Sequence, residues 1–404
     1  AREGAFSPLP PPPLSFLPTP AQMSCEIDPD TATIVARTGA RLFSVLCEQK
    51  PELPVTLLSP LSLSAAFALA LAGATAGAQS ERELQGLVGS EHARVAALSS
   101  SLVAAGAAGG GVTLDVANSV WLRKSIKPAF AHLLQNAHAA EVAALPATYE
   151  PVNSWVEKKT EGRITNLLSG EPDSLVVALL VNAVLFKGSW TTQFDEKLTQ
   201  PGKFFPFDKG SPPLDAHFMS RKAQLPAAAS LETLGGASAV FLDYGTSKSD
   251  FGALFVLPPE PGMASLASTV SKLCAVNLQD VLIGMTAKET SVALPRFRAE
   301  SQTIDMVPAM RALGLRETFD GKSGFNGMSD DPDVHVDEVL HKVVIEVNEE
   351  GTVAAAATAV VMRSRSLPPP PLKLRFDRPF VMVVLHKATG LPLFFARLNQ
   401  PLFL

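Results

Sequence analysis

The chain has 404 residues, of which 47% are hydrophobic and 18% are charged, so it has ample apolar material for a core and lacks the composition of a disordered protein. Its 34 basic and 39 acidic residues give a net charge of −5, which argues against a nucleic-acid binder, because such proteins usually carry a basic patch. Cys25, Cys47 and Cys274 form no CxxC pair and are too few for a disulfide framework. Together with the lack of an Asn-X-Ser/Thr acceptor, this favours an intracellular protein, while secretion stays open.

The first residues of the chain predict a loose extension. Residues 1–22 are rich in proline, with four consecutive prolines at positions 10–13, and they contain no apolar stretch of the signal-peptide type. Met23 is an alternative start, so whether residues 1–22 belong to the mature protein stays open. We expect a proline-rich, disordered extension over residues 1–30 and a single domain over residues 31–404.

Helices are predicted mainly in the first half. Apolar residues at helical spacing predict an amphipathic helix from Thr31 to Cys47. Residues 55–80 carry no charge, but Pro60, two glycines and several hydroxyl side chains argue against a membrane span. A short strand ending at Ser59-Pro60 and a buried helix from Leu61 to Gly73 are predicted instead. A strand over residues 112–122 and a helix over residues 151–168 follow.

Strands dominate the second half, apart from a short helix over residues 307–313. The long apolar run at 175–186 is typical of a strand that is buried on both faces. Thr389-Gly390 predicts a turn between the last two strands. The pattern indicates an α+β fold without internal repeats. The further strands are predicted at 204–207, 239–244, 253–257, 291–297, 341–347, 379–385 and 391–398.

Common catalytic motifs are missing from the sequence. None of the seven histidines lies in an HExxH motif, and there is no GxSxG nucleophile motif. We therefore expect no enzyme, no metal and no cofactor.

The most unusual segment is 349–372. An acidic turn is followed by eleven uncharged residues, Thr352 to Met362, which are mostly small or β-branched, and then by Arg363, Arg365 and four prolines at 368–371. In an extended strand the alternate residues share one face, which here could be buried without burying a charge. Small side chains also suit a segment that must enter an existing sheet. The residues of that face are Thr352, Ala354, Ala356, Thr358, Val360 and Met362.

Three further motifs, in order along the chain, resemble those of the serpin family of suicide-substrate protease inhibitors. Asn153-Ser154-Trp155, followed by Gly162-Arg163-Ile164, is similar to the family's helix-F motif. Residues 182–190, from Asn182 to Trp190, resemble its central-strand signature, and residues 376–380 with Thr389-Gly390 resemble its C-terminal signature. The resemblance covers the chain from about residue 31 to Pro401.

The resemblance implies the serpin fold, with three β-sheets, about eight or nine helices and an exposed reactive-centre loop at about residues 349–374. It also implies that a protease cleaves the loop and is trapped as an acyl-enzyme when the loop inserts into the large sheet. The family's reactive bond lies at a fixed distance from the hinge glycine, and fourteen residues beyond Gly351 is Arg365. Cleavage at Arg365–Ser366 suits a trypsin-like protease with an acidic pocket, and Arg363 is a second candidate.

The resemblance also assigns residues to the moving parts. Val353 departs from the family, whose inhibitory members commonly carry Glu there, and the segment between Ser366 and Arg378 is about three residues longer than usual, with prolines that favour a stiff arm. The implied hinge is Glu349, Glu350, Gly351, Thr352, Val353, Ala354, Ala355, Ala356 and Ala357; the implied shutter is Ser59, Ser62, Asn182 and His341; and the implied breach residue is Trp190.

The expected partner is a trypsin-like serine protease, held in a covalent complex, with no nucleic acid and no membrane. Heparin is not expected, because residues 80–111 mix Arg82 and Arg94 with three glutamates. We expect a monomer, with loop–sheet polymerisation as an alternative state. Two alternatives stay open: a cross-class inhibitor of papain-like cysteine proteases and a non-inhibitory serpin.

Overall fold

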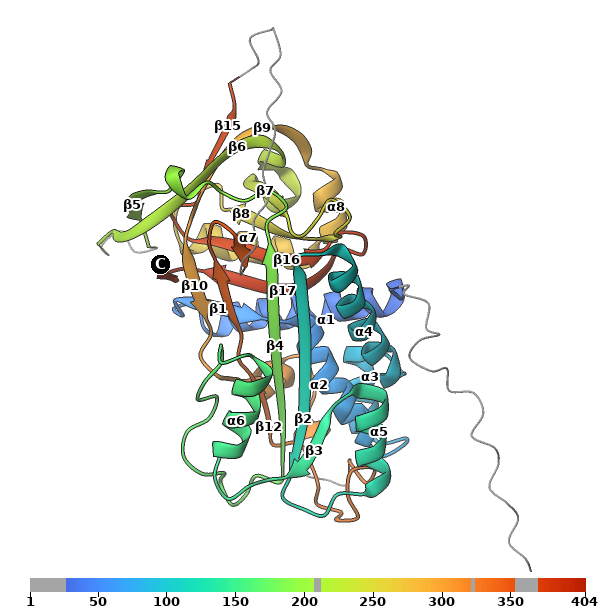
Figure 1. Ribbon diagram of the computed structural model, residues 1–404. Helices are drawn as coiled ribbons and strands as arrows, with labels where there is room; N and C mark the ends of the chain where they lie inside the picture. The colour runs from blue at the N-terminus through green and yellow to red at the C-terminus, as the bar shows by residue number, and fades with distance from the viewer. Residues whose placement is uncertain (1–26, 207–211, 321–323, 353–369) are drawn as a thin grey trace, which may run out of the picture.

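The computed structural model describes residues 27–206, 212–320, 324–352 and 370–404 (Figure 1). Of the extension predicted over residues 1–30, residues 1–26 therefore lie outside the described residues, and the first helix already begins at Pro29. The hinge residues Val353 to Ala357 and the reactive bond Arg365–Ser366 lie outside the described residues as well.

Within the described residues the chain forms nine α-helices, three short 3-10 helices and three β-sheets, as expected from the α+β pattern. The α-helices are α1 (Pro29–Gln49), α2 (Pro60–Gly73), α3 (Gln79–Val88), α4 (His92–Gly109), α5 (Pro128–His138), α6 (Glu150–Lys159), α7 (Met263–Ala275), α8 (Leu278–Ile283) and α9 (Val307–Ala312). The strands are β1 (Val55–Leu58), β2 (Val112–Leu122), β3 (Glu141–Ala144), β4 (Ala178–Ser189), β5 (Gln200–Phe204), β6 (Leu214–Leu231), β7 (Ala237–Asp243), β8 (Phe251–Leu257), β9 (Thr286–Pro295), β10 (Phe297–Glu300), β11 (Ile304–Asp305), β12 (Glu338–His341), β13 (Val344–Val347), β14 (Gly351–Thr352), β15 (Leu372–Arg375), β16 (Phe380–His386), β17 (Leu391–Leu398) and β18 (Leu402–Phe403).

The six-stranded sheet is built around β4. Its path is β11-β12-β4-β2-β3, and the short strand β14 pairs with the end of β4. β4 runs antiparallel to β2 and parallel to β12, which pairs His341 with Asn182. A nine-stranded sheet contains β1, β17, β16, β8, β7, β6, β9 and β15, with β5 paired to β6, and a three-stranded sheet contains β13, β10 and β18.

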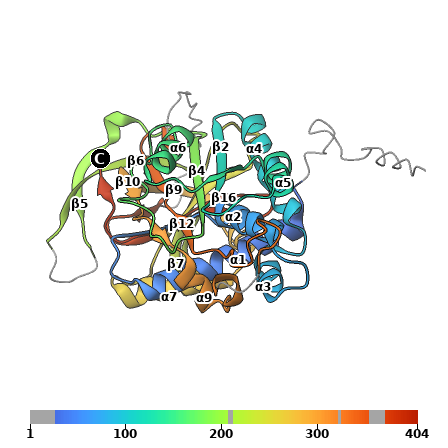
Figure 2. The same ribbon diagram turned by 90° about the horizontal axis from the view of Figure 1, so that it is seen from below.

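Helices cover both faces of the six-stranded sheet. Figure 1 shows α6 in front of β4 and β12, and Figure 2 shows α1, α2 and α9 on the opposite side of this sheet. Trp155 of α6 and Ile164 of the following turn belong to one buried cluster with Val181 of β4 and Leu340 of β12. Because one cluster joins β4 to β12, α6 rests on both strands.

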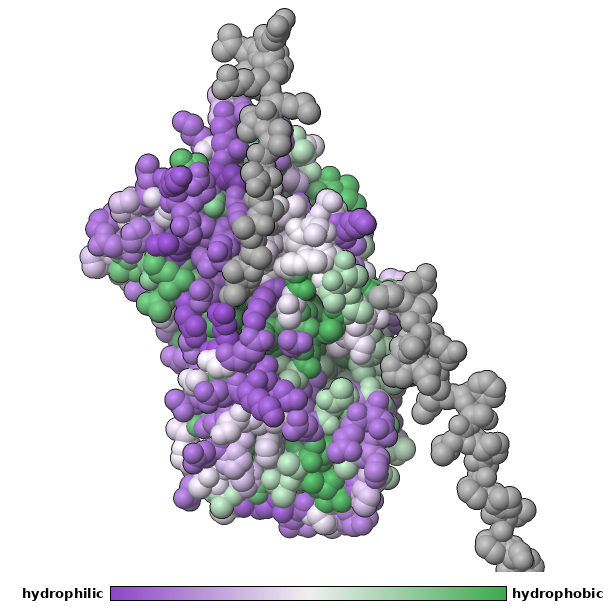
Figure 3. Space-filling model, in the orientation of Figure 1, coloured by the Kyte–Doolittle hydropathy of each residue, from purple (hydrophilic) through white to green (hydrophobic). Residues whose placement is uncertain are grey.

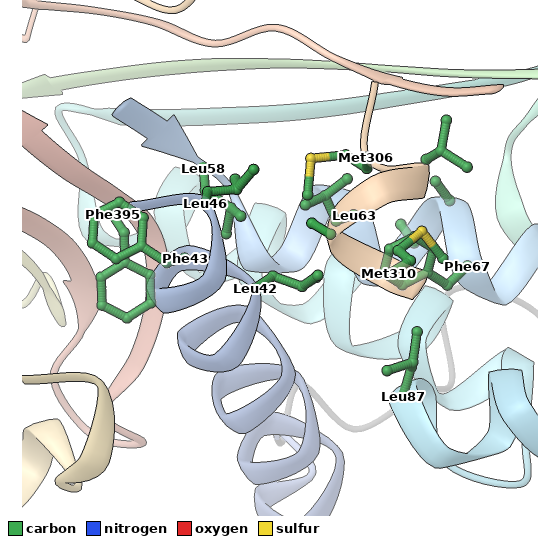
Figure 4. Packing of buried hydrophobic residues seen from close by; sticks show 14 of the residues in the cluster. Leu42, Phe43, Leu46, Leu58, Leu63, Phe67, Leu87, Met306, Met310 and Phe395 are labelled. Atoms are coloured by element: carbon green, nitrogen blue, oxygen red, sulfur yellow. The ribbon is translucent and has the colours of Figure 1, made fainter. Parts of the chain in front are cut away.

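The main core lies behind the sheet, around α1 and α2. Of the fourteen residues of α2, all but Ala72 are buried, as the uncharged sequence predicted. Figure 4 shows side chains of α1, α2, α3 and α9 meeting there. Phe43 of α1 stacks on Phe395 of β17, with ring centroids 5.0 Å apart and an interplanar angle of 15°. Among the described residues, no helix combines the length and the apolar character that a membrane crossing requires.

The single strand predicted at 341–347 is divided in the structure. The chain there forms two strands, β12 and β13, which belong to different sheets. They separate at Val343, which exchanges hydrogen bonds with Ser301 instead of continuing along β4. The alternating pattern continues across the break because both strands bury the same face, and such a pattern reports burial rather than strand partners.

Other boundaries also differ from prediction, and the strand predicted at 291–297 covers parts of β9 and β10, which lie in different sheets. The helix predicted over 151–168 ends at Lys159, because Glu161 and Gly162 adopt positive φ angles of 49° and 75°. Ile164 and Leu167 are still buried, although they lie in turns. The strand predicted at 204–207 is β5, which ends at Phe204, and the Phe205 N–H donates instead to the carbonyl of Asp377, 2.7 Å away.

Candidate functional site

The end of β4 receives a second strand from the acidic turn. Gly351 pairs with Ser189, and Thr352 pairs with Gly188. Asn348 and Gly351 exchange two backbone hydrogen bonds of 3.0 and 3.3 Å, so β14 turns back directly beside β13. β14 therefore lies between β4 and β13 at the top of the sheet.

Below β14 this place in the sheet is not filled by a described strand. Residues 183–187 of β4 pair with β2, and among the described strands they have no partner on their other side. Residues 344–347 of β13 pair with β10. We call the place between these two segments the open position.

Gly351 is required by the sharpness of this turn. Its φ is 141°, which a residue with a side chain rarely adopts. A Cβ atom there would lie 2.1 Å from the carbonyl oxygen of Gly188. Only glycine lets the two strands approach this closely.

Trp190, the expected breach residue, holds the turn in place. Its indole Nε1–H donates to the carbonyl of Asn348 over 3.0 Å, and its backbone N–H donates to the carbonyl of Glu350 over 2.9 Å. The indole is buried and stacks on Tyr244, with ring centroids 4.4 Å apart. The indole ring therefore donates a hydrogen bond to the turn from one edge and packs against the core with its face.

Glu349 anchors the same turn through a buried carboxylate. Its side chain is only 6% exposed and lies 3.7 Å from Nη1 of Arg296. The Thr199 hydroxyl donates to Oε1 over 2.5 Å, and the Phe194 N–H donates to the Glu349 carbonyl over 2.9 Å. A buried charge with these partners is costly to disrupt, since removing one partner leaves the other uncompensated.

The four expected shutter residues come together behind the sheet. The Ser59 N–H donates to Nε2 of His341 over 3.1 Å, and His341 lies opposite Asn182 in the pairing of β12 with β4. The Ser59 hydroxyl accepts from the Ser62 N–H, 3.4 Å away, and caps α2. All four residues are at most 2% exposed.

Sequence reasoning missed a fifth member of this cluster. Asn118 of β2 is buried and pairs with Asn182, whose Nδ2–H donates to its side-chain oxygen over 2.5 Å. The available signal was an asparagine in the middle of a predicted strand, because an amide that becomes buried there needs a hydrogen-bond partner.

The cluster is not fully satisfied in this form of the molecule. Oδ1 of Asn182 and Nδ1 of His341 are buried without a hydrogen-bond partner among the described residues. Burial lowers the pKa of His341 to about 3, so its ring is neutral at physiological pH. Since Nε2 accepts a hydrogen bond from Ser59, the proton of the neutral ring is on Nδ1. The Ser62 hydroxyl is likewise buried without a hydrogen-bond partner among the described residues, so the cluster presents three polar side-chain atoms that are not hydrogen-bonded.

These observations describe a site that can accept a strand. It has a turn that starts the strand, an open position beside β4 and polar atoms without partners farther along. In the described part of the chain, no three His, Cys, Asp or Glu side chains group as a metal site needs.

Comparison with known proteins gives one consistent result. The family model described as "Serpin (serine protease inhibitor)" matches residues 34–401. The chain is 34% identical over 370 residues to Serpin-ZX of Arabidopsis thaliana, covering 86% of this chain and 92% of the relative. It is 30% identical over 383 residues to the leukocyte elastase inhibitor of Bos taurus, covering 90% and 98%. The solved structure of Arabidopsis AtSerpin1 in its native stressed conformation matches with a TM-score of 0.78 and 27% identity, covering 94% of this chain and 99% of that one.

Proposed function

The chain belongs to the serpin family of serine protease inhibitors, and on this premise we propose that it is a suicide-substrate inhibitor of trypsin-like serine proteases. The serine hydroxyl of the protease adds to the carbonyl carbon of Arg365. The Arg365–Ser366 C–N bond then breaks, and the new amine of Ser366 takes up a proton, which leaves an ester between Arg365 and the protease. Inhibition results if the loop inserts into the sheet before water hydrolyses this ester.

The observation that carries the proposal is the agreement of two strand registers. Counting onward from the pairs of β14 with β4, one residue at a time, places residue 358 opposite Asn182. Counting onward from the Asn348–Gly351 turn along the other side places the same residue 358 opposite His341. β12 and β4 already pair His341 with Asn182. A strand of residues 351–361 can therefore follow both sides in one continuous register, provided that β12 separates from β4 where the two strands pair now.

The side chains of such a strand suit the two faces of the sheet. Residues of even number would share the face of Gly188 and Asn182, which looks toward the core, and they carry no charge from Thr352 to Val360. From residue 353 to residue 361, the residues of odd number would face α6, and they are valine or alanine. Insertion therefore buries no unpaired charge, which would otherwise cost several kcal/mol.

The inserted strand also accounts for the trapping of the protease. Eleven residues of β-strand span roughly 36 Å at about 3.3 Å per residue. A protease attached at Arg365 would be carried from the top of the sheet to its far end. In this proposal Ser59, Ser62, Asn182 and His341 hold the strands together before insertion.

The relatives support the general activity more firmly than the target. The bovine relative is named as an inhibitor of leukocyte elastase, which is a statement about that protein. The preference for a trypsin-like protease rests on Arg365 alone, because an arginine side chain requires an acidic pocket in the protease.

Incubation with trypsin tests the proposal. We expect an SDS-stable complex, a released C-terminal peptide that begins with Ser366, and a higher melting temperature of the cleaved chain. A peptide that begins with Ser364 would move the reactive residue to Arg363. Clean cleavage without a complex would indicate a non-inhibitory serpin, and a stable complex with papain but not with trypsin would indicate cross-class inhibition.

A further inference from the structure

The turn after α6 carries two oppositely charged residues that reach opposite sides of the open position. The carboxylate of Glu161 pairs with Nζ of Lys187 on β4. The guanidinium of Arg163 lies 3.5 Å from the carboxylate of Glu346 on β13. Lys187 is the one residue of β4 that is not fully buried, so it marks where the outer face of this strand can be reached.

The Arg163 side of this arrangement extends into the three-stranded sheet. Arg298 of β10 lies opposite Glu346, 3.9 Å from its carboxylate, and also donates to the backbone carbonyl of Arg163 over 3.2 Å. Glu300 pairs with Arg298 at 3.1 Å and with Lys342 at 3.0 Å. Arg163 is therefore held by a network of charges rather than by one exposed ion pair.

The turn itself is well braced. The Thr160 hydroxyl donates to the Val156 carbonyl over 2.8 Å and accepts the Ile164 N–H over 3.1 Å. Ile164 is buried in the cluster that fixes α6 to the sheet. The two charges are thus presented at a nearly fixed separation, and the turn cannot follow β4 and β13 if they move in different directions.

The strand registers locate the turn relative to the entering loop. Counting from β14 along β4 places residue 353 opposite Lys187, and counting along β13 places the same residue opposite Glu346. We propose that the turn after α6 is an ionic strap, formed by Glu161 and Arg163, that spans the sheet at the entry point and slows insertion beyond Thr352. Glu161 and Arg163 are then positioning residues that set how often the protease is trapped. This inference rests on the proposed function.

The chemistry of Val353 adds to the argument. A charged side chain at this position could exchange partners with Lys187 or Glu346 as it entered, but valine offers neither ion a new partner. The ion pairs of Glu161 and Arg163 must therefore break during insertion without new ion pairs replacing them. Figure 3 shows hydrophilic side chains gathered on this face between the upper strands and α6, where solvent reaches them. The four charged side chains of the strap are between 25% and 56% exposed, so their attraction is modest and sensitive to salt.

The test compares Glu161→Gln and Arg163→Gln with the control Glu141→Gln. The control removes the 3.0 Å ion pair between Lys159 of α6 and Glu141 of β3, which belongs to the same helix but does not span the open position. The rate of insertion is followed by tryptophan fluorescence after rapid mixing with trypsin. We expect each strap variant to insert between about 1.5-fold and fivefold faster than the wild type and to need fewer inhibitor molecules per trapped protease. The control should match the wild type.

Two further measurements separate a strap from a general loosening of α6. The advantage of the strap variants should shrink between about 0.05 M and about 0.5 M salt, because screening weakens the wild-type strap. The double exchange Glu161→Lys with Lys187→Glu should restore the wild-type rate. Equal rates for strap variants, control and wild type would overturn the strap alone. Cleavage of the wild type without a rise in melting temperature would overturn the proposed function and the strap together.

Discussion

Replacing Thr358 with valine should weaken the cleaved, inserted form of the chain and leave the intact form unchanged. If the loop inserts as proposed, the two registers would bring residue 358 between Asn182 and His341. Oδ1 of Asn182 and Nδ1 of His341 lack partners among the described residues, and a hydroxyl can donate to the first and accept from the second. Valine has nearly the shape of threonine but can do neither.

The size of the effect follows from these two hydrogen bonds. Each contributes about 0.5–1.5 kcal/mol, so the cleaved form should lose about 1–3 kcal/mol of its free energy of unfolding. The intact form should change by less than about 0.5 kcal/mol, because in this form β12 and β4 pair His341 with Asn182 directly.

Guanidinium unfolding of the intact and the trypsin-cleaved chains measures both values. Thr358→Ser is the matched control, because it keeps the hydroxyl and should retain most of the stability of the cleaved form. A valine variant that weakens both forms equally, or neither, would show that the continuous register is wrong.

Three other outcomes are expected. Thr352→Arg should turn the inhibitor into a substrate by placing a charge on the core face, whereas Val353→Arg should do far less harm; equal stoichiometry of inhibition for the two variants would contradict the assigned faces. The free energy of unfolding should fall as the pH drops from about 6.5 toward 3, because His341 takes up a proton in the unfolded chain but stays neutral in the folded chain, where burial lowers its pKa to about 3. In acid titrations of stability, His341→Gln should reduce the dependence of this free energy on pH by about 1.4 kcal/mol per pH unit. Burial raises the pKa of the Cys47 thiol to about 12 and that of Cys274 still further, so neither should react with iodoacetamide at about pH 8 until the chain unfolds, which peptide mapping would show.

Elements with a uniformly apolar or an alternating sequence pattern could be predicted from the sequence. α2 and β2 agree with the expected ranges nearly residue for residue, since their apolar patterns report burial directly. β6 is the longest strand and was not predicted, because Pro226 and a run of alanines weaken its pattern and the strand is recognisable mainly through its pairing with β9.

Some residues of the candidate site could also be predicted from the sequence, and others could not. The resemblance to a family could name Ser59, Asn182 and His341 as one group, although they are far apart in the sequence. It could not reveal Asn118, or that β12 and β13 belong to different sheets, because both facts depend on which strands become neighbours. The pairing of Gly351 with Ser189 was likewise invisible before the fold was known.

The division of residues 338–347 between two sheets also determines which parts of the molecule open together. Residues 183–187 of β4 have no partner on the side of the open position among the described strands, and β10 with β13 can open without breaking a ladder to β4. A strand that pairs with both sides would join the three-stranded and six-stranded sheets. Amides on both flanks would then pass from local exchange with solvent into the slowest class, which exchanges only on global unfolding. The two sheets would then unfold as one cooperative unit, and hydrogen exchange would detect this as similar protection of amides in both sheets.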